Sequence, residues 1–132
     1  MMLLDSSLLV AYKIRNDINH GKANALMKQV VSERFGKPMI SDYIFDETVT
    51  GIFVRSRSLA LAAEYASELL ASPEMLKVDE RAFREAWDIF SRQEKRELSF
   101  TDSIALMKIH DIGNVGTFDG DFKAIKGIDA VG

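Results

Sequence analysis

The sequence predicts an α/β fold with a central, mainly parallel sheet of four or five strands. Short apolar runs, typical of buried strands, alternate along the chain with longer segments in which apolar residues have helical spacing. The first run, 1–4, ends abruptly in Asp5, Ser6 and Ser7. A carboxylate at that position lies at the edge of the sheet where open α/β folds bind ligands. It can equally be the N-cap of the next helix.

Length and composition limit the possible classes of protein. The chain has 132 residues, so we expect one domain over 1–132. It has no cysteine, which excludes disulfides and thiolate metal sites. No apolar run approaches the roughly 18 residues of a membrane span, so we expect a soluble cytoplasmic protein with no membrane partner. The net charge of -3, from 17 basic and 20 acidic residues, argues against a nucleic-acid partner unless bound cations cancel clustered acids.

Two helices are expected between the first and second strands. Residues 6–13 form the first, and 22–34 form the second because its apolar residues recur at helical spacing. The stretch between them is rich in turn-forming residues, so His20 is expected to be a solvated loop residue. Met39 and Ile40 then form the second strand.

The next predicted helix, 42–56, contains an acid next to its buried side. Ser41 is its expected N-cap, and Asp42 lies in the first turn, where the helix dipole favours a negative charge. The predicted buried stripe comprises Phe45, Thr48, Val49 and Ile52. Glu47 lies beside that stripe, where a carboxylate must be paired, hydrated or metal-bound. Asp46 points about 100° away and is expected to be solvated.

A helix is expected over 59–71 with Ser58 as its N-cap, and a third strand is expected over 75–78. Asp79 caps a further helix that ends near residue 92. One face of this helix is expected to belong to the core rather than to form a base-stacking platform, and its residues are Ala82, Phe83, Ala86, Trp87 and Phe90. The charged run 92–97 is expected to be solvated surface.

The last third of the chain contains three further acids of interest. Ser99 or Thr101 can start a helix that places Asp102 in its first turn, and His110 at its end is expected to be structural or exposed. A fourth strand, 115–117, is followed by Asp119 and Asp121. Their spacing is similar to part of a calcium loop, but the closing Glu of an EF-hand is missing. A helical turn over 122–126 and a last strand over 128–131 complete the chain.

The acids singled out above either follow a strand or lie in the first half of a helix: Asp5, Glu47, Asp102, and Asp119 or Asp121. Strand ends and the N-termini of the adjacent helices face the same edge of a parallel sheet. The acids can therefore converge there, although convergent carboxylates repel one another unless cations join them. All-oxygen sites suit Mg²⁺ or Mn²⁺, and such ions activate water for hydrolysis. The sequence therefore predicts a divalent-metal site at this edge.

Four segments together resemble a PIN domain, specifically the VapC type of toxin ribonuclease from prokaryotic toxin–antitoxin pairs. They are LLDSS, ISDYIFDETVT, LSFTDSIAL and TFDGDF. The resemblance covers essentially the whole chain and implies a three-layer α/β/α fold. It also implies hydrolysis of RNA phosphodiester bonds by metal-activated water.

The resemblance assigns roles residue by residue. The acids implied to be catalytic and to bind Mg²⁺ or Mn²⁺ are Asp5, Glu47, Asp102 and Asp119. Asp121 would be an auxiliary metal ligand, and whether it or Asp119 lies nearer the metal stays open. Ser6 or Thr117 would be a polar helper near the metal or phosphate. The implied partners are an RNA substrate, a cognate antitoxin whose tail blocks the site, and a second copy in a homodimer.

Some basic residues could line the RNA approach, although each is more simply a surface residue: Lys13, Arg15, Lys22, Arg55, Arg57, Arg92, Lys95 and Arg96. Two other functions are open. A haloacid dehalogenase-type phosphatase also has an Asp after its first strand, but needs a second Asp where this chain has Ser7. The second alternative is a non-catalytic RNA-binding PIN-like protein. The full set of acids argues against this alternative.

Overall fold

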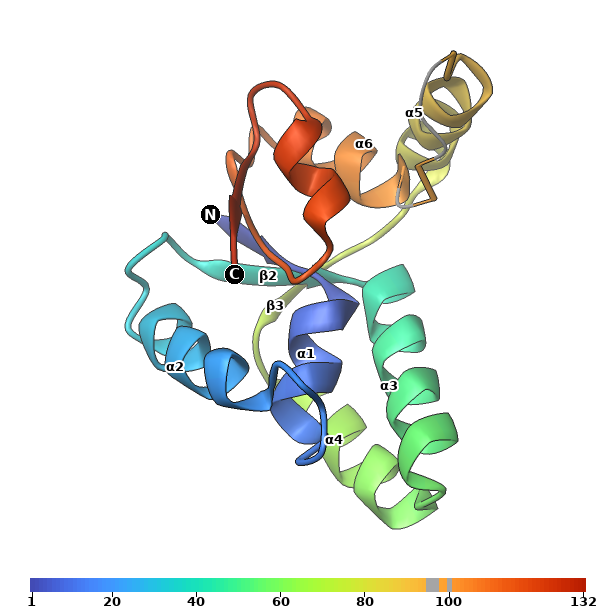
Figure 1. Cartoon of the computed structure of the whole chain (residues 1–132). Helices are drawn as coiled ribbons and strands as arrows, with labels where there is room; N and C mark the ends of the chain where they lie inside the picture. The colour runs from blue at the N-terminus through green and yellow to red at the C-terminus, as the bar shows by residue number, and fades with distance from the viewer. Residues whose placement is uncertain (95–97, 100) are drawn as a thin grey trace.

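The chain folds into three layers, with a parallel sheet between two layers of helices (Figure 1). The computed structural model describes residues 1–94, 98–99 and 101–132. The predicted α/β/α architecture and the predicted number of strands are confirmed in this part of the chain. The charged run predicted at 92–97 lies partly outside the described residues, as do Lys95 and Arg96.

The sheet has the strand order β3-β2-β1-β4-β5, and every neighbouring pair is parallel. The strands are short, and their bounds are Met2–Leu4 (β1), Pro38–Ser41 (β2), Glu74–Leu76 (β3), Asn114–Gly116 (β4) and Asp129–Val131 (β5). β1 is the central strand, which explains why its apolar run is uninterrupted.

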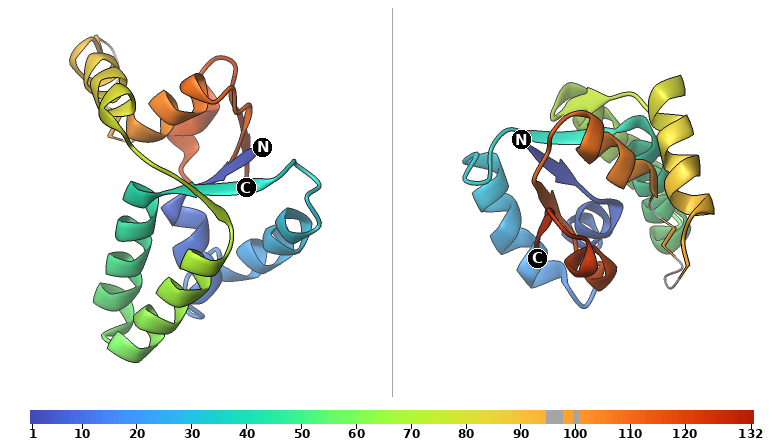
Figure 2. Two further views of the ribbon diagram at one scale, coloured as in Figure 1. Left: turned by 180° about the vertical axis from the view of Figure 1, so that it is seen from behind. Right: turned by 90° about the horizontal axis from the view of Figure 1, so that it is seen from above.

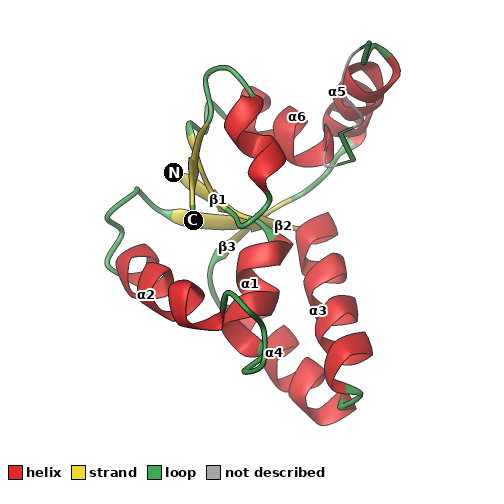
Figure 3. Cartoon of the chain, viewed as in Figure 1, coloured by secondary structure: helices red, strands yellow, loops and turns green. Residues whose placement is uncertain are grey.

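The helices cover both faces of the sheet, as the two views of Figure 2 and the colouring of Figure 3 show. One layer contains α1 (Ser6–Lys13), α2 (His20–Val31), α3 (Asp42–Ser56) and α4 (Leu59–Ala71). The other contains α5 (Glu80–Ser91), α6 (Thr101–Ile109) and the short 3-10 helix η1 (Gly120–Ala124). The predicted caps Asp5, Ser41, Ser58 and Asp79 each accept a hydrogen bond from the first turn of their helix.

The strand order creates a topological switch point beside β1. The chain runs outward from β1 to β2 and β3 with its helices on one face, then crosses back to β4 with its helices on the other. The carboxyl ends of β1 and β4 therefore flank the crevice in which open α/β sheets bind ligands. Asp5 follows β1 there, and Thr117 follows β4.

The core is continuous and tightly packed around β1. Met2, Leu3 and Leu4 are fully or almost fully buried, as is Leu8 of α1. Gly116 of β4 has no space for a side chain, because a Cβ there would lie 2.8 Å from the Leu8 Cδ2 atom. The absence of a side chain at this position lets α1 pack closely against the end of β4.

Two predictions about individual residues are wrong. His20 is not a solvated loop residue: it begins α2, and its ring bonds the Ala11 carbonyl at 2.8 Å and the Asn24 amide at 3.2 Å. The aromatic residues of α5 are not core, since Phe83 is 58% exposed, Trp87 60% and Phe90 49%. Only Ala82 and Ala86 on that face are buried, because α5 packs through these small residues.

The exposed His110 agrees with its prediction. In the described part of the chain, no helix combines the length and the apolar character that crossing a membrane requires.

Candidate active site

Asp5 is both the N-cap of α1 and the most buried acid at the switch point. Only 8% of it is exposed. Its Oδ2 atom accepts hydrogen bonds from the Ser7 backbone N–H, the Ser7 hydroxyl and the Thr117 hydroxyl, the last at 2.9 Å. Among the described residues, its other oxygen, Oδ1, accepts none. One carboxylate oxygen is thus fixed by the protein, and the other is available to a ligand.

Two hydroxyl groups connect Asp5 to the loop after β4. The Phe118 N–H donates to the Ser7 Oγ at 3.0 Å, and the Asp119 N–H donates to the Thr117 Oγ1 at 2.9 Å. Each hydroxyl can therefore accept from a backbone amide and donate to Asp5. This network holds the ends of β1 and β4 together and orients the carboxylate.

Glu47 reaches the same edge from the middle of α3. It is exposed, and its Oε2 atom accepts a hydrogen bond of 3.2 Å from the Ser6 hydroxyl, beside Asp5 in sequence. Desolvation raises the pKa of the Glu47 carboxyl, and the negative charges of Asp102 and Asp5 raise it further. These acids are therefore close enough to repel one another.

Asp102 lies in the first turn of α6, as predicted. Desolvation is the largest cause that raises its pKa, and the charges of Asp5 and Asp42 add to it. The backbone N–H groups of Asp102 and Ser103 oppose this shift by bonding the carboxylate. The helix start thus partly stabilises a charge that the neighbouring acids disfavour.

Asp119 and Asp121 lie at the other side of the crevice. Asp119 caps η1 by accepting a hydrogen bond of 3.0 Å from the Asp121 N–H, and its own N–H contacts Asp5 indirectly through Thr117. The Asp121 residue is exposed. Asp119 is therefore connected to Asp5 by hydrogen bonds through the Thr117 hydroxyl. We call the edge of the sheet that carries Asp5, Glu47, Asp102 and Asp119 the acidic edge.

The predicted acids approach one another to different degrees. Asp5, Glu47 and Asp102 are coupled through their charges, and Asp119 adjoins Asp5 through the hydroxyl network. No group of three or more acidic or histidine side chains among the described residues already forms an arrangement able to hold an ion. Glu47 is exposed, so its side chain has room to change rotamer.

Sequence reasoning missed two polar residues at this edge. Ser7 fixes Asp5, and its position two residues after a helix-capping acid was the available signal. The Asp42 Oδ1 accepts from the Val78 N–H at 2.9 Å, which joins the start of α3 to the segment after β3. No local pattern could predict that contact, because the two residues are distant in sequence.

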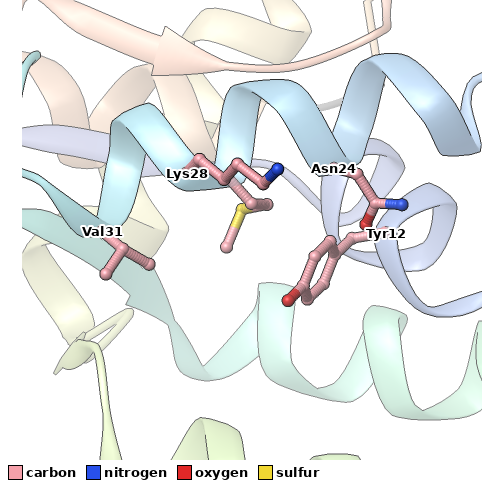
Figure 4. A pocket seen from close by; sticks show the side chains of 5 residues that line it. Tyr12, Asn24, Lys28 and Val31 are labelled. Carbon is pink, nitrogen blue, oxygen red and sulfur yellow. The ribbon is translucent and has the colours of Figure 1, made fainter.

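Pockets adjoin the acids on the α3 side. Asp42, Tyr43, Asp46 and Glu47 line one of about 390 Å³. A smaller pocket of about 180 Å³ includes Asp102 in its wall. A pocket of about 440 Å³ lies elsewhere, between α1 and α2, and Figure 4 shows Tyr12, Asn24, Lys28 and Val31 around it. That pocket contains none of the predicted site residues.

Two of the basic residues that could line the RNA approach form ion pairs. Arg55 pairs with Asp17 at 2.6 Å, and Lys13 lies 3.8 Å from Glu68 and over the Tyr65 ring. Arg15, Lys22, Arg57 and Arg92 are exposed.

The strand order, the three layers and the approach of Asp5, Glu47 and Asp102 to the switch point limit the class of protein. A family model for the PIN domain matches residues 2–128, and the chain belongs to the PIN domain family.

Within that family the chain is similar to VapC toxins. Two curated relatives from Mycobacterium tuberculosis, strains CDC 1551 and H37Rv, are named 23S rRNA-specific endonuclease VapC20. Each is 31% identical over 126 residues, which cover 94% of this chain and 93% of the relative. The crystal structure of M. tuberculosis VapC20, described as a sarcin-ricin loop cleaving toxin, matches with a TM-score of 0.81 and 29% identity over 94% of each chain.

Proposed function

We propose that this protein is a metal-dependent endoribonuclease that hydrolyses RNA phosphodiester bonds, and that it is the toxin of a type II toxin–antitoxin pair. The observation that supports this most is the coupling of Asp5, Glu47 and Asp102 at the switch point of a PIN domain. Similarity to the VapC20 endonucleases over nearly the whole chain supports the reaction class.

The donor set at the acidic edge fits a divalent cation. All of its candidate ligands are oxygens, the Oδ1 of Asp5 accepts no hydrogen bond from the described residues, and Glu47 and Asp102 have raised pKa values that a cation would reverse. We therefore assign Asp5, Glu47, Asp102 and Asp119 as catalytic metal ligands for Mg²⁺ or Mn²⁺, with Asp121 as an auxiliary acid. When bound, such an ion activates water and stabilises charge on the phosphate oxygens.

Hydroxyl and backbone groups of this chain position the proposed catalytic carboxylates. Ser7 and Thr117 hold the Oδ2 atom of Asp5 by hydrogen bonds, which leaves Oδ1 for a metal ion. Ser6 positions the Glu47 carboxylate, while the backbone at the start of α6 holds Asp102. Preorganised carboxylates reduce the reorganisation needed when the phosphate arrives.

The expected partners follow from the class of toxin. We propose an RNA substrate, a cognate antitoxin that inhibits the site, a homodimer and a cytoplasmic location. The sarcin-ricin loop is the first RNA to test, because the similar VapC20 proteins act on it.

Cleavage assays test the proposal directly. Purified protein is incubated with 23S rRNA and with a generic phosphomonoester, each in Mn²⁺ or in EDTA. We expect RNA cleavage only with Mn²⁺, none by Asp5→Asn, and no release of phosphate from the monoester. Hydrolysis of the monoester alone would favour the phosphatase alternative, and RNA binding without cleavage would favour a non-catalytic PIN-like protein.

A further inference from the structure

We propose that the pocket between Tyr43, Phe83 and Trp87 binds an unpaired base of the RNA, next to the phosphate that is cleaved. The inference deepens the proposed nuclease function and rests on it. It gives a role to the aromatic face of α5, which the described metal site does not use.

The exposure of these aromatic side chains is the first observation. Phe83, Trp87 and Phe90 follow one another at helical spacing on α5, and each is at least 49% exposed. The Trp87 and Phe90 rings are stacked, with centroids 5.9 Å apart and planes at 24°. Phe90 thereby restrains the Trp87 ring while leaving much of it accessible. A contiguous exposed aromatic patch of this kind is typical of a binding surface.

The composition and size of the pocket favour a base. Aromatic residues from two helices, Tyr43 of α3 with Phe83 and Trp87 of α5, form much of its wall, and Val78 and Ala86 add apolar surface. Its volume is about 180 Å³. Sites for drug-sized ligands have about 300–1,000 Å³. The smaller space suits one planar ring system.

The pocket is continuous with the acidic edge. Thr101 and Asp102 complete its wall, and the charge of Asp102 acts on Glu47. Tyr43 also lines the adjoining pocket that contains Glu47. A base and its phosphate are separated by one sugar. A base in this pocket therefore leaves the neighbouring phosphate beside the proposed metal ligands.

Stacking also answers the difficulty posed by the net charge of -3. Every base offers a π-face, so stacking on an aromatic side chain adds affinity that does not depend on the net charge of the protein. Proteins that read RNA commonly stack splayed, unpaired bases on aromatic side chains. Here the aromatic pocket would supply affinity while cations neutralise the acids.

Fluorescence gives a direct test, because Trp87 is the single tryptophan of the chain. The probe is a short, mixed-sequence single-stranded RNA in Mn²⁺, added to the full chain with Glu47→Gln to prevent cleavage. We expect saturable quenching of Trp87. We then replace each nucleotide in turn by an abasic one, and expect one position to weaken binding by about 5- to 150-fold.

Substitutions separate stacking from general apolar contact. Trp87→Tyr keeps an aromatic face and should retain most of the RNA affinity, whereas Trp87→Leu should lose about 5- to 150-fold. Phe53→Ala is the matched control, since Phe53 is 46% exposed on α3. It lies about 15 Å along that helix from Tyr43 and should leave RNA affinity unchanged.

The readout distinguishes this inference from the function on which it rests. Quenching measures binding, so it is observable even if the wild type fails to cleave RNA, in which case only the nuclease proposal fails. Absence of quenching, or equal binding by every abasic probe, overturns the base pocket. So does a Trp87→Leu chain that binds RNA normally but no longer self-associates in sedimentation, which would assign the aromatic face to a second copy.

Discussion

Carboxylates lie on both sides of the acidic edge, but their surroundings differ in hydrogen bonding and in neighbouring charge. On the β1–β4 side, Asp5 is buried and receives three hydrogen bonds on one oxygen. On the helical side, Glu47 and Asp102 have pKa values raised by desolvation and by neighbouring negative charge. Asp5 is thus fixed by the protein, while the other two acids are held in mutual repulsion.

This difference indicates that the acids on the two sides contribute differently to metal binding. Asp5 is held by three hydrogen bonds and would offer a cation a fixed ligand, whereas the exposed Glu47 side chain could move toward the ion. A rigid ligand costs little reorganisation. Repelling ligands gain most when a cation arrives. Substitutions on the two sides should therefore differ in their effects on activity and on stability.

The largest expected effect is the loss of cleavage in Asp5→Asn. The change removes a negative ligand while keeping a side chain that can still cap α1. We expect cleavage to be abolished with the fold retained, and growth arrest on expression to disappear. The measurement is the rate of RNA cleavage in Mn²⁺, with circular dichroism as the folding control. Asp102→Asn should also abolish cleavage while the fold is retained. Near wild-type cleavage by both variants would contradict the metallonuclease proposal.

Ser7→Ala should have the next largest effect, because it removes the fixation of Asp5 without removing a ligand. Loss of a residue that orients a metal ligand typically costs 10–100-fold in activity or metal affinity, and we expect about that loss in cleavage. Ser67→Ala is the control, since that exposed hydroxyl donates to the Ala63 carbonyl within its own helix, α4. If both variants cleave equally well, the hydroxyl network does not position Asp5.

Melting curves with and without Mn²⁺ test whether Asp102 on α6 binds the metal. Manganese at 100 times its dissociation constant should stabilise the wild type by about 2.7 kcal/mol, or about 10 °C in Tm. Asp102→Asn should gain much less, because the ion loses one ligand. A variant that gains as much as the wild type would make Asp102 a structural acid of the α6 first turn, with the metal site elsewhere.

The melting temperature of Asp102→Asn, measured in EDTA as a function of pH, should reveal the destabilisation caused by the charge of Asp102. The folded-state pKa of Asp102 is raised above its ordinary value of 3.8, so ionised Asp102 destabilises the fold at neutral pH. Protonation relieves this as the pH falls through the raised pKa. We expect Asp102→Asn to melt at or above the wild type at pH 7, and the difference to shrink toward pH 4. A lower Tm at pH 7 would indicate that the first-turn dipole contact dominates.

Much of the fold could be predicted because its signals are local. The apolar run before Asp5, the caps Ser41, Ser58 and Asp79, and the apolar spacing of α4 each depend on neighbouring residues. That Asp5, Glu47 and Asp102 lie near enough for their charges to interact was predictable for a different reason. Parallel topology sends strand ends and following helix starts to one edge.

The wrong predictions share a physical cause. The alternation of apolar and charged residues on α5 identifies an apolar face but not what covers it, and α5 buries Ala82 and Ala86 while leaving Trp87 exposed. Likewise, the ring of His20 is held by Ala11 and Asn24, so its surroundings depend on how α2 packs against the end of α1. Such contacts depend on packing between elements, which sequence periodicity does not specify.

The smallest expected effects concern the two histidines, which lie outside the acidic edge. His20→Ala removes the bonds to the Ala11 carbonyl and the Asn24 amide and should cost about 1 kcal/mol, or about 4 °C in Tm. His110 is exposed, so His110→Ala should change the free energy of unfolding by less than about 0.5 kcal/mol. Both should cleave RNA within a few-fold of the wild type, because the proposed reaction uses carboxylates rather than imidazole. A folded variant that loses about a hundredfold or more in cleavage would identify that histidine as a general base and break the division between the two sides.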